Sequence, residues 1–276
     1  MNELQKVELE ILKVFLEICE KEKLKYFLVC GSALGAAKYN GFIPWDDDID
    51  VALPRKDYEK FLSVATNYLP EWCFLQNYKT DSEFYAMGTK LRDSRTTYIE
   101  KMCGKLKINH GVFIDVFPLD CHWKSHSNKF KFKCLLKKFE GKRRVHLDYR
   151  RISRENLFSI QTNFYYFANK IFGLFENTSK VIEEFDTFLS CKEREDEFWC
   201  NYANSTSEKE YAPKVQYGEG TPAIFEGLNV IIPENYDEYL KQKYGDWEAD
   251  LPEEQKKGHH YYEVCDLKKS YKEYLR

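Results

Sequence analysis

Apolar and polar positions alternate with a helical period in three parts of the chain. In residues 3–22 an apolar side chain recurs every third or fourth position, at Leu4, Val7, Ile11, Val14 and Ile18. Residues 55–68 and 179–189 carry comparable apolar stripes. We expect these segments to form amphipathic helices, and we expect the first to pack on a sheet without contributing to the chemistry.

Short apolar runs between these segments predict strands. The run at 26–30 is continuously apolar, and residues 48–53 alternate acidic and apolar side chains, which is the period of a strand. Further strands are expected at 72–77, 84–91 and 110–120, with a polar turn at 92–97 and a short helix at 33–38. Helices interleaved with strands predict a mixed α/β (α+β) fold.

The last third of the chain predicts a hairpin followed by a helix. Residues 225–233 are expected to form a hairpin, and a helix is expected at 234–244. Residues 204–222 are polar and include Gly218, Gly220 and Pro222, so we expect a mobile loop near the substrate.

The middle of the chain differs in composition from both ends. Between residues 124 and 154, twelve Lys and Arg residues face only Glu140 and Asp148, and residues 157–175 are rich in Phe and Tyr. The second segment is too polar to span a bilayer. Two interpretations stay open: packing of a helical insertion, or peripheral contact with an anionic membrane surface or polymer. We expect a core at 1–123, this insertion at 124–190, and a C-terminal part at 191–276 that completes the core and the substrate site.

Composition narrows the class of protein. The chain has 276 residues and a formal net charge of −3, which argues against a general nucleic-acid binder. The nine cysteines contain no Cys-x-x-Cys pair, and the first residues do not resemble a signal peptide. No stretch has 18 or more apolar residues. We therefore expect a cytoplasmic protein, with peripheral contact at the inner face of the membrane as an open option.

Four aspartates within five residues are the strongest chemical signal. Asp46, Asp47, Asp48 and Asp50 lead directly into the alternating run, so Asp48 and Asp50 should point to one face of a strand. Two carboxylates that close repel each other unless a cation lies between them, and oxygen ligands suit Mg²⁺, with Mn²⁺ as an alternative. The other interpretation is an acidic turn that caps the helix expected at 55–68. We expect Asp46 and Asp47 to support the metal-bearing strand.

Two further pieces complete the candidate site. Gly31 and Ser32 follow an expected strand and precede a helix, where backbone N–H groups can bind a phosphate. Asp115 lies inside the apolar run 110–120, and burying a lone carboxylate is costly unless it is paired or bound to metal. It is predicted to be a third metal ligand or the acceptor of a hydroxyl proton; the alternative is a carboxylate bonded to neighbouring backbone.

Other residues are weaker candidates. Lys90 and Arg92 are cations suited to a diphosphate, or else exposed turn charges. His259 or His260 is expected to contact donor phosphate or acceptor sugar, or to have no role. Trp45 either lines the metal site or fills the core.

Gly-Ser followed by an Asp-x-Asp strand and a later carboxylate resembles the nucleotidyltransferase fold of the DNA polymerase β superfamily. The segments Gly-Ser-Ala-Leu-Gly at 31–35, Gly-Phe-Ile-Pro-Trp-Asp-Asp-Asp-Ile-Asp-Val at 41–51 and Ile-Asp-Val-Phe-Pro-Leu-Asp at 114–120 are similar to the LicD family, which contains bacterial phosphocholine transferases and is related to fukutin-related protein. The resemblance covers roughly residues 5–120 and 223–260, with Phe-Glu-Gly-Leu at 225–228 and Tyr-Gly-Asp at 244–246.

The resemblance implies an activity that the residues alone leave open. It implies Mg²⁺-dependent transfer of a phosphocholine-like group from CDP-choline or a related CDP-alcohol to a hydroxyl of a cell-surface glycan or its lipid-linked precursor, with release of CMP. Such acceptors include lipopolysaccharide, teichoic acid and capsule. Catalytic and metal roles then fall to Asp48, Asp50 and Asp115, and donor contacts to Gly31, Ser32, Lys90, Arg92 and His259.

Two alternatives remain. The same carboxylates would serve a true nucleotidyltransferase, which transfers a nucleoside monophosphate and releases pyrophosphate. A non-catalytic nucleotide-binding protein on the same fold is the second alternative, against which stands the presence of all three acids.

Overall fold

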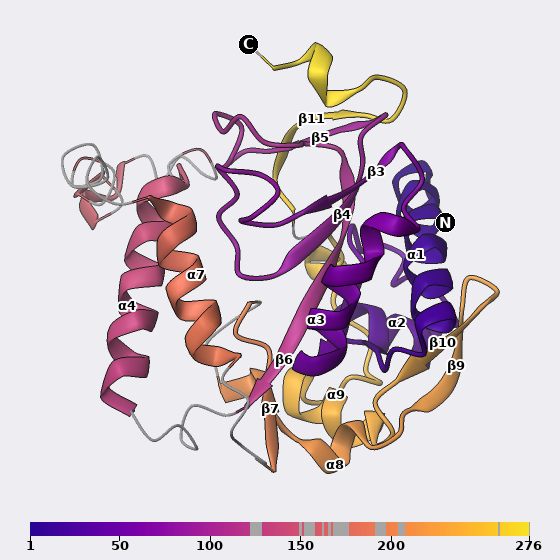
Figure 1. Cartoon of the computed structure of the whole chain (residues 1–276). Helices are drawn as coiled ribbons and strands as arrows, with labels where there is room; N and C mark the ends of the chain where they lie inside the picture. The colour runs from indigo at the N-terminus through magenta and orange to yellow at the C-terminus, as the bar shows by residue number, and fades with distance from the viewer. Residues whose placement is uncertain are drawn as a thin grey trace.

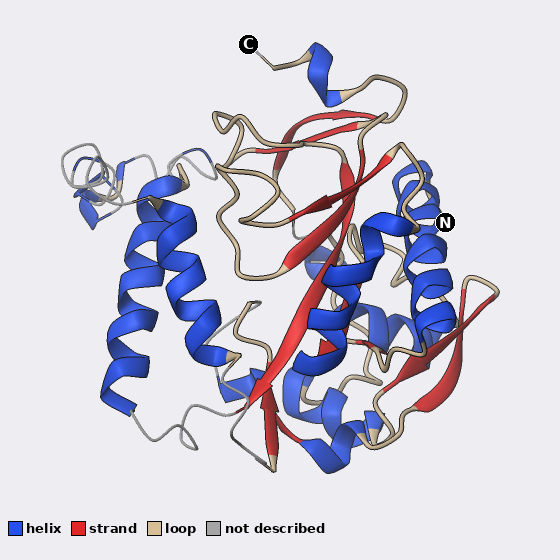
Figure 2. Ribbon diagram, in the orientation of Figure 1, coloured by secondary structure: helices blue, strands red, loops and turns tan. Residues whose placement is uncertain are grey.

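The computed structural model shows a mixed α/β protein, as the sequence predicts (Figures 1 and 2). It describes residues 1–121, 129–148, 177–190, 197–203, 208–258 and 260–275, together with a few positions between 151 and 167. Within these residues no helix is both long and apolar enough to cross a membrane. The described cysteines are free thiols.

A central sheet runs through the molecule and has β6 (Val112–Cys121) as its long middle strand (Figure 1). Its order is β1-β2-β6-β4-β3, with β7 (Phe198–Cys200) and β8 (Tyr211–Pro213) added beyond the end of β6. The other strands are β1 (Phe27–Leu28), β2 (Asp50–Pro54), β3 (Cys73–Gln76) and β4 (Thr89–Asp93). Among the described strands of this sheet, β2 and β6 pair in parallel and the other pairs are antiparallel, so the sheet is mixed.

Helices α1 (Glu3–Glu22) and α3 (Arg55–Val64) lie together against the sheet (Figure 2). Phe15 of α1 packs on Phe61 of α3 with ring centroids 5.3 Å apart. The buried stripe of α1 is rotated from the expected one: Leu4, Val7 and Val14 are only partly buried, and Gln5 and Glu8 are buried instead. Asn2 caps α1, since its side chain accepts from the Gln5 N–H.

The first part of the site lies between two helices and a hairpin. Helix α2 (Cys30–Tyr39) contacts α9 (Tyr236–Tyr244) and the hairpin of β9 (Thr221–Phe225) and β10 (Leu228–Ile232). The expected hairpin and helix are confirmed. Glu226 and Gly227 form the two-residue turn, both at positive φ, which suits the twist of paired strands.

Residues 204–222 differ from the expected loop. Residues 204–207 lie outside the described part, and the rest contains β8, the short helix α8 (Lys214–Tyr217) and the start of β9. Tyr217 stacks among Phe27, Trp199 and Tyr239 and is buried. The segment is therefore part of the core, because its aromatic side chain fills a space that local polarity does not reveal.

Helices α4 (Lys129–His146) and α7 (Thr178–Leu189) form an antiparallel pair to one side of the sheet (Figure 1). Phe132 and Phe139 of α4 pack on Phe185 of α7. The basic segment therefore forms a helix with its own apolar contacts. Most of residues 149–176 lie outside the described part, including most of the aromatic segment at 157–175.

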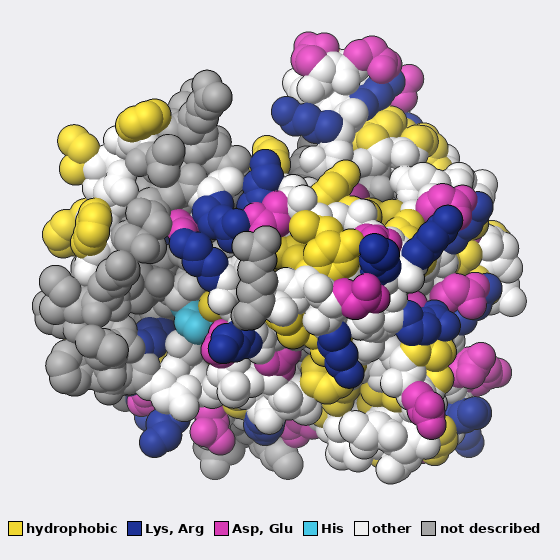
Figure 3. Space-filling model, turned by 90° about the horizontal axis from the view of Figure 1, so that it is seen from above, with side chains coloured by type: hydrophobic (Ala, Val, Ile, Leu, Met, Phe, Trp, Pro, Cys, Tyr) yellow, Lys and Arg dark blue, Asp and Glu magenta, His cyan; other side chains and the backbone are white. Residues whose placement is uncertain are grey.

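A two-stranded sheet of β5 (Thr97–Glu100) and β11 (Tyr262–Asp266) brings the C-terminal segment beside the core (Figure 1). Positive and negative side chains are interspersed over the described part of the face in Figure 3, without an extended patch of one sign.

Candidate active site

The register of three strands gathers charged side chains on one face of the sheet. Asp50 of β2 lies opposite Asp115 of β6, and Lys90 of β4 lies opposite Asp115 from the other side. Because side chains alternate between faces, the three point to the same face, away from Val51, Val116 and Thr89. Thr89 bonds Tyr58 of α3 at 2.6 Å, so the helices cover the opposite face.

Asp48, Asp50 and Asp115 meet in space. Carboxylate oxygens of the three residues lie within 4.8 Å of one another. Strand β2 begins at Asp50 rather than at Asp48, but the preceding residue is still bonded to β6, since the Asp115 N–H donates to the Ile49 carbonyl at 2.8 Å. Asp48 is therefore held beside the strand pair.

The start of α2 fixes Asp50. The Asp50 N–H donates to Ser32 Oγ at 2.8 Å, and the Asp50 carbonyl accepts from the Val29 N–H at 3.0 Å. Ser32 is buried, so its hydroxyl oxygen serves the protein rather than an open surface. Gly31 and Ser32 lie in the first turn of α2, where Val29 provides no side-chain cap and the positive end of the helix favours an anion.

The acids repel one another in the absence of a cation. Burial, followed by the charges of Asp48 and Asp115, raises the pKa of Asp50 well above its ordinary value. Burial also raises the pKa of Asp48; His260 opposes this shift, and Asp115 and Asp47 add to it. Oxygen donors at this spacing fit a divalent ion such as Mg²⁺, which would relieve the repulsion.

Lys90 supplies one positive charge to this group. Its Nζ donates to Asp115 Oδ2 at 3.0 Å and lies 3.2 Å from the centre of the Phe113 ring. Both side chains are largely buried. One ammonium beside three carboxylates leaves the site negative, so Lys90 orients Asp115 but does not replace a metal.

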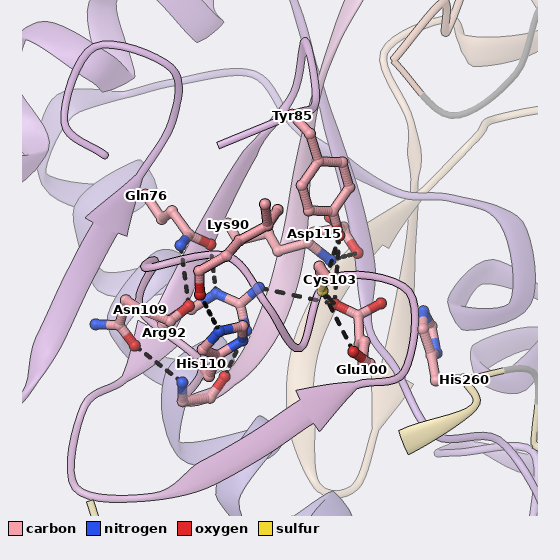
Figure 4. Close-up of polar contacts among 12 residues, drawn as sticks. Gln76, Tyr85, Lys90, Arg92, Glu100, Cys103, Asn109, His110, Asp115 and His260 are labelled. Carbon is pink, nitrogen blue, oxygen red and sulfur yellow. Dashed lines mark hydrogen bonds and ion pairs between the residues drawn. The ribbon is translucent and has the colours of Figure 1, made fainter. Parts of the chain in front are cut away.

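Arg92 was expected in a polar turn, as a cation that contacts the donor diphosphate, but the structure places it elsewhere. It lies in β4 and is fully buried, with Nε bonded to Gln76 and Nη1 donating to the Gly111 carbonyl at 2.6 Å (Figure 4). Its Nη2 lies 3.8 Å from Glu100. Gln76 and Gly111 hold the guanidinium inside the protein, although its Nη2 has no hydrogen-bond partner among the described residues. The structure therefore does not support a direct contact between Arg92 and the donor. The guanidinium instead bonds Gln76 and Gly111, which belong to the protein around the site.

His260 lies beside the acids, whereas His259 falls outside the described residues. The His260 backbone N–H donates to Asp47 Oδ2 at 3.1 Å, and its Nδ1 lies 3.2 Å from Asp47 Oδ1. Its Nε2 is 3.9 Å from Asp48 Oδ2. Burial lowers the pKa of His260, but the Asp47 bond and the charges of Asp48 and Glu100 outweigh it and raise the pKa to about 10.

Asp46 and Glu8 extend the acidic group toward α1. Burial, followed by the charges of Asp48 and Asp47, raises the pKa of Asp46 to about 8. Its carboxylate faces Gly31 so closely that a Cβ there would lie 2.6 Å from Asp46 Oδ2. Gln5 of α1 donates to the Asp46 carbonyl at 3.0 Å. The first helix thus contributes to the site, contrary to expectation.

A pocket of about 560 Å³ opens from the acids. Asp46, Asp48 and Asp50 line one part of it, together with Gly31. Aromatic, aliphatic and charged side chains form the remaining wall. Trp45 is one of them, so of the two interpretations of this residue the structure favours the one that places it at the site.

Several of these residues have little signal in the local sequence pattern. Glu8 flanks the expected apolar stripe of α1 and resembles the other charged residues of that helix, so its burial becomes visible only in the structure. Glu100, Glu210 and Lys243 carry no local signal. Lys243 and Glu210 form a buried ion pair at 2.8 Å beside the pocket, brought together only by the fold.

Comparison with known proteins agrees with this geometry. The family described as "LicD/FKTN/FKRP, nucleotidyltransferase domain" matches residues 23–141, which confirms the expected nucleotidyltransferase fold. The lipopolysaccharide cholinephosphotransferase LicD of Haemophilus influenzae is 30% identical over 97% of this chain and 98% of its own length. Uncharacterised proteins of Rickettsia typhi and Rickettsia prowazekii match 21% and 17% of the chain, at 30% and 35% identity. Given this coverage from end to end, the chain belongs to the LicD family of phosphotransferase enzymes.

Proposed function

We propose that this protein transfers a phosphocholine-like phospho-alcohol group from a CDP-linked donor to a hydroxyl of a cell-surface glycan or its lipid-linked precursor, releasing CMP. The observation that carries the proposal is the meeting of Asp48, Asp50 and Asp115 within 4.8 Å, with Asp48 and Asp50 also lining a pocket. The likeness to a lipopolysaccharide cholinephosphotransferase supports the choice of phospho-alcohol and of acceptor.

The three carboxylates would hold Mg²⁺, or Mn²⁺ in its place. Burial, followed by repulsion from Asp48 and Asp115, raises the pKa of Asp50, and a bound cation would relieve both effects. Such an ion, when bound, neutralises charge on the phosphoryl oxygens of the donor.

The residues of the chain have separable roles in the transfer. The N–H groups at the start of α2, around Gly31, would bind a donor phosphate. The acceptor hydroxyl oxygen bonds to the phosphorus that carries the alcohol, and the bond from that phosphorus to the oxygen of CMP breaks. Asp115, oriented by Lys90, would accept the hydroxyl proton or complete the set of metal ligands. His260, fixed by Asp47, would steady Asp48.

A product assay separates this proposal from its alternatives. With Mg²⁺ and CDP-choline, we expect CMP and a choline-labelled glycan; with CTP, we expect no pyrophosphate. Pyrophosphate from CTP would favour the true nucleotidyltransferase. If neither substrate is turned over and nucleotide still binds with Mg²⁺, the chain is a non-catalytic nucleotide-binding protein.

The exposed basic face of α4 bears on how the protein would reach its acceptor. Six basic side chains of α4 are exposed: Lys129, Lys131, Lys133, Lys137, Lys138 and Arg144. They support peripheral contact with an anionic membrane that carries a lipid-linked acceptor. Replacing Lys129, Lys131 and Lys133 by Gln should reduce sedimentation with anionic liposomes and spare donor hydrolysis. Unchanged sedimentation would favour simple packing of the insertion.

A further inference from the structure

The pocket beside the acids has a wall of aromatic side chains. Tyr39, Trp45, Tyr244 and Trp247 all line it, and they come from two segments far apart in the sequence. The rings of Tyr39 and Trp45 are 6.4 Å apart and nearly perpendicular, at 77°. Perpendicular aromatic rings present more than one π face to the same space, which is the arrangement that binds quaternary ammonium groups.

Trp247 presents its ring rather than its polar edge. Its indole N–H donates to Asp237 Oδ1 at 3.0 Å, and its ring packs against Tyr236. Because the polar atom is already bonded, what Trp247 offers to the pocket is apolar aromatic surface.

The polar groups of the pocket favour a cation over a hydroxylated or base-like group. Among the residues that the structure describes, its lining includes five carboxylates: Asp46, Asp48, Asp50, Glu210 and Asp246. The same lining has no Ser, Thr, Asn, Gln, Arg or His side chain. Side chains that usually read the edge of a base or the hydroxyls of a polyol are thus missing from that lining.

The three lysines of the lining already have oxygen partners. The Lys38 ammonium donates to the carbonyls of Glu248 and Ala249 at 2.7 and 3.0 Å. Lys243 is paired with Glu210, and Lys209 donates to the Lys243 carbonyl at 3.2 Å. These ammonium groups are held by oxygen atoms of the protein. Glu210 is paired and Asp48 and Asp50 are assigned to the metal, so the rings and the carboxylates of Asp46 and Asp246 are left to meet a ligand.

The aromatic rings attract cations in this structure. Lys256 places its ammonium 5.4 Å from the centre of the Trp45 ring, and Lys38 lies 5.7 Å from that of Tyr39. Lys38 also lines the pocket, so a cation already lies beside an aromatic ring within this lining. Asp48 and Asp50 belong to the same pocket, which places a group attached to a metal-bound phosphate next to these rings.

We propose that Tyr39, Trp45 and Trp247, with Asp46 and Asp246, bind the quaternary ammonium head of the transferred phospho-alcohol and thereby select a choline-type donor. This inference rests on the proposed function, because it assumes that the adjacent acids hold the donor diphosphate. It assigns the headgroup to one wall and assigns donor selectivity to aromatic residues that the metal chemistry does not use.

Titration calorimetry with matched donors tests the assignment. CDP-choline and CDP-glycerol share the same cytidine diphosphate and differ only in the headgroup, and CMP lacks the headgroup. In the full-length protein with Mg²⁺ and no acceptor, we expect CDP-choline to bind roughly tenfold more tightly than CDP-glycerol. Trp45→Leu should remove most of that difference and leave CMP affinity unchanged, whereas Trp45→Phe should retain much of it.

Trp72→Leu is the matched control, since Trp72 also carries a cation, Arg95, over its ring but does not line the pocket. Equal affinity for the two donors would overturn the headgroup assignment and leave the proposed function standing. A Trp45→Leu variant that loses CMP and both donors equally would place the cytosine base on this wall. If no ligand binds with Mg²⁺, the proposed function itself fails.

Discussion

Asp50 and Asp115 lie opposite each other in the parallel pairing of β2 with β6, and both point to the face that Lys90 shares. This register brings together two residues that are 65 positions apart in the chain, and Asp48 joins them through the segment just before β2. A one-residue slip would turn Asp50 to the face covered by α3. The pairing is therefore what creates the acidic site.

Asp50→Ala should reduce turnover by roughly a hundredfold or more, because it removes charge placed for the transition state. The fold should persist, since the substitution removes one of several carboxylates that repel one another. Rate measurements with CDP-choline and thermal melting would check both parts. Glu71→Ala, which removes an exposed carboxylate, is the control. Near-normal turnover in Asp50→Ala would count against the assignment.

Lys90→Met should destabilise the metal-free protein by about 3 kcal/mol, because Asp115 would keep a buried charge without its partner. Mg²⁺ should restore more stability to this variant than to the wild type. Urea unfolding with and without Mg²⁺ measures both effects. The exposed Lys79→Met serves for comparison. Equal stabilities of Lys90→Met and wild type would show that the ion pair does not hold Asp115.

Gly31→Ala should weaken donor binding more than folding. The added methyl group would meet Asp46 Oδ2 at 2.6 Å, at the turn of α2 proposed to bind phosphate. Gly141→Ala in α4, where a Cβ meets nothing within 4 Å, should be neutral or stabilising by about 1 kcal/mol. Steady-state kinetics should give a raised KM for the donor in Gly31→Ala, and an unchanged KM would contradict the close approach.

Glu8→Gln should stabilise the metal-free protein at high pH. Burial, followed by the charges of Asp48, Asp47 and Asp46, raises the pKa of Glu8 well above its ordinary value of 4.5. The folded state therefore keeps a proton that the unfolded chain has lost, and stability falls as pH rises above about 4.5 toward the raised pKa. The neutral Gln removes this dependence.

Melting curves in EDTA from about pH 5 to about pH 8 would test the Glu8 prediction. The variant should melt higher than the wild type at the upper end, by about 2 °C or more, with the difference shrinking toward pH 5. A difference that stays constant with pH would mean that Glu8 is not held protonated.

The local sequence pattern predicts positions whose environment is determined by neighbouring residues in the chain. Asp115 in an apolar run and the glycine turn at Gly227 were identifiable because burial and positive φ constrain single positions. Arg92 was not, since its burial depends on Gln76 and Gly111, which reach it only through strand pairing.

Long-range contacts explain the other differences. In the sequence, Glu8 resembles a solvated charge on α1. In the structure, α1 packs on the loop at Asp46, and Glu8 is buried there. The pocket wall combines α2 and the loop after it with the segment after α9. No pattern within these segments predicts that Trp45 and Trp247 line the same space. Site residues that act together across the chain thus become visible only in the fold.

The central claim is that the three aspartates bind one divalent ion beside the pocket. Anomalous diffraction from crystals soaked with Mn²⁺ and CDP-choline tests it most directly. The account predicts a manganese peak between the carboxylates of Asp48, Asp50 and Asp115, and loss of the peak in Asp50→Ala. A peak elsewhere with none between these side chains would contradict it.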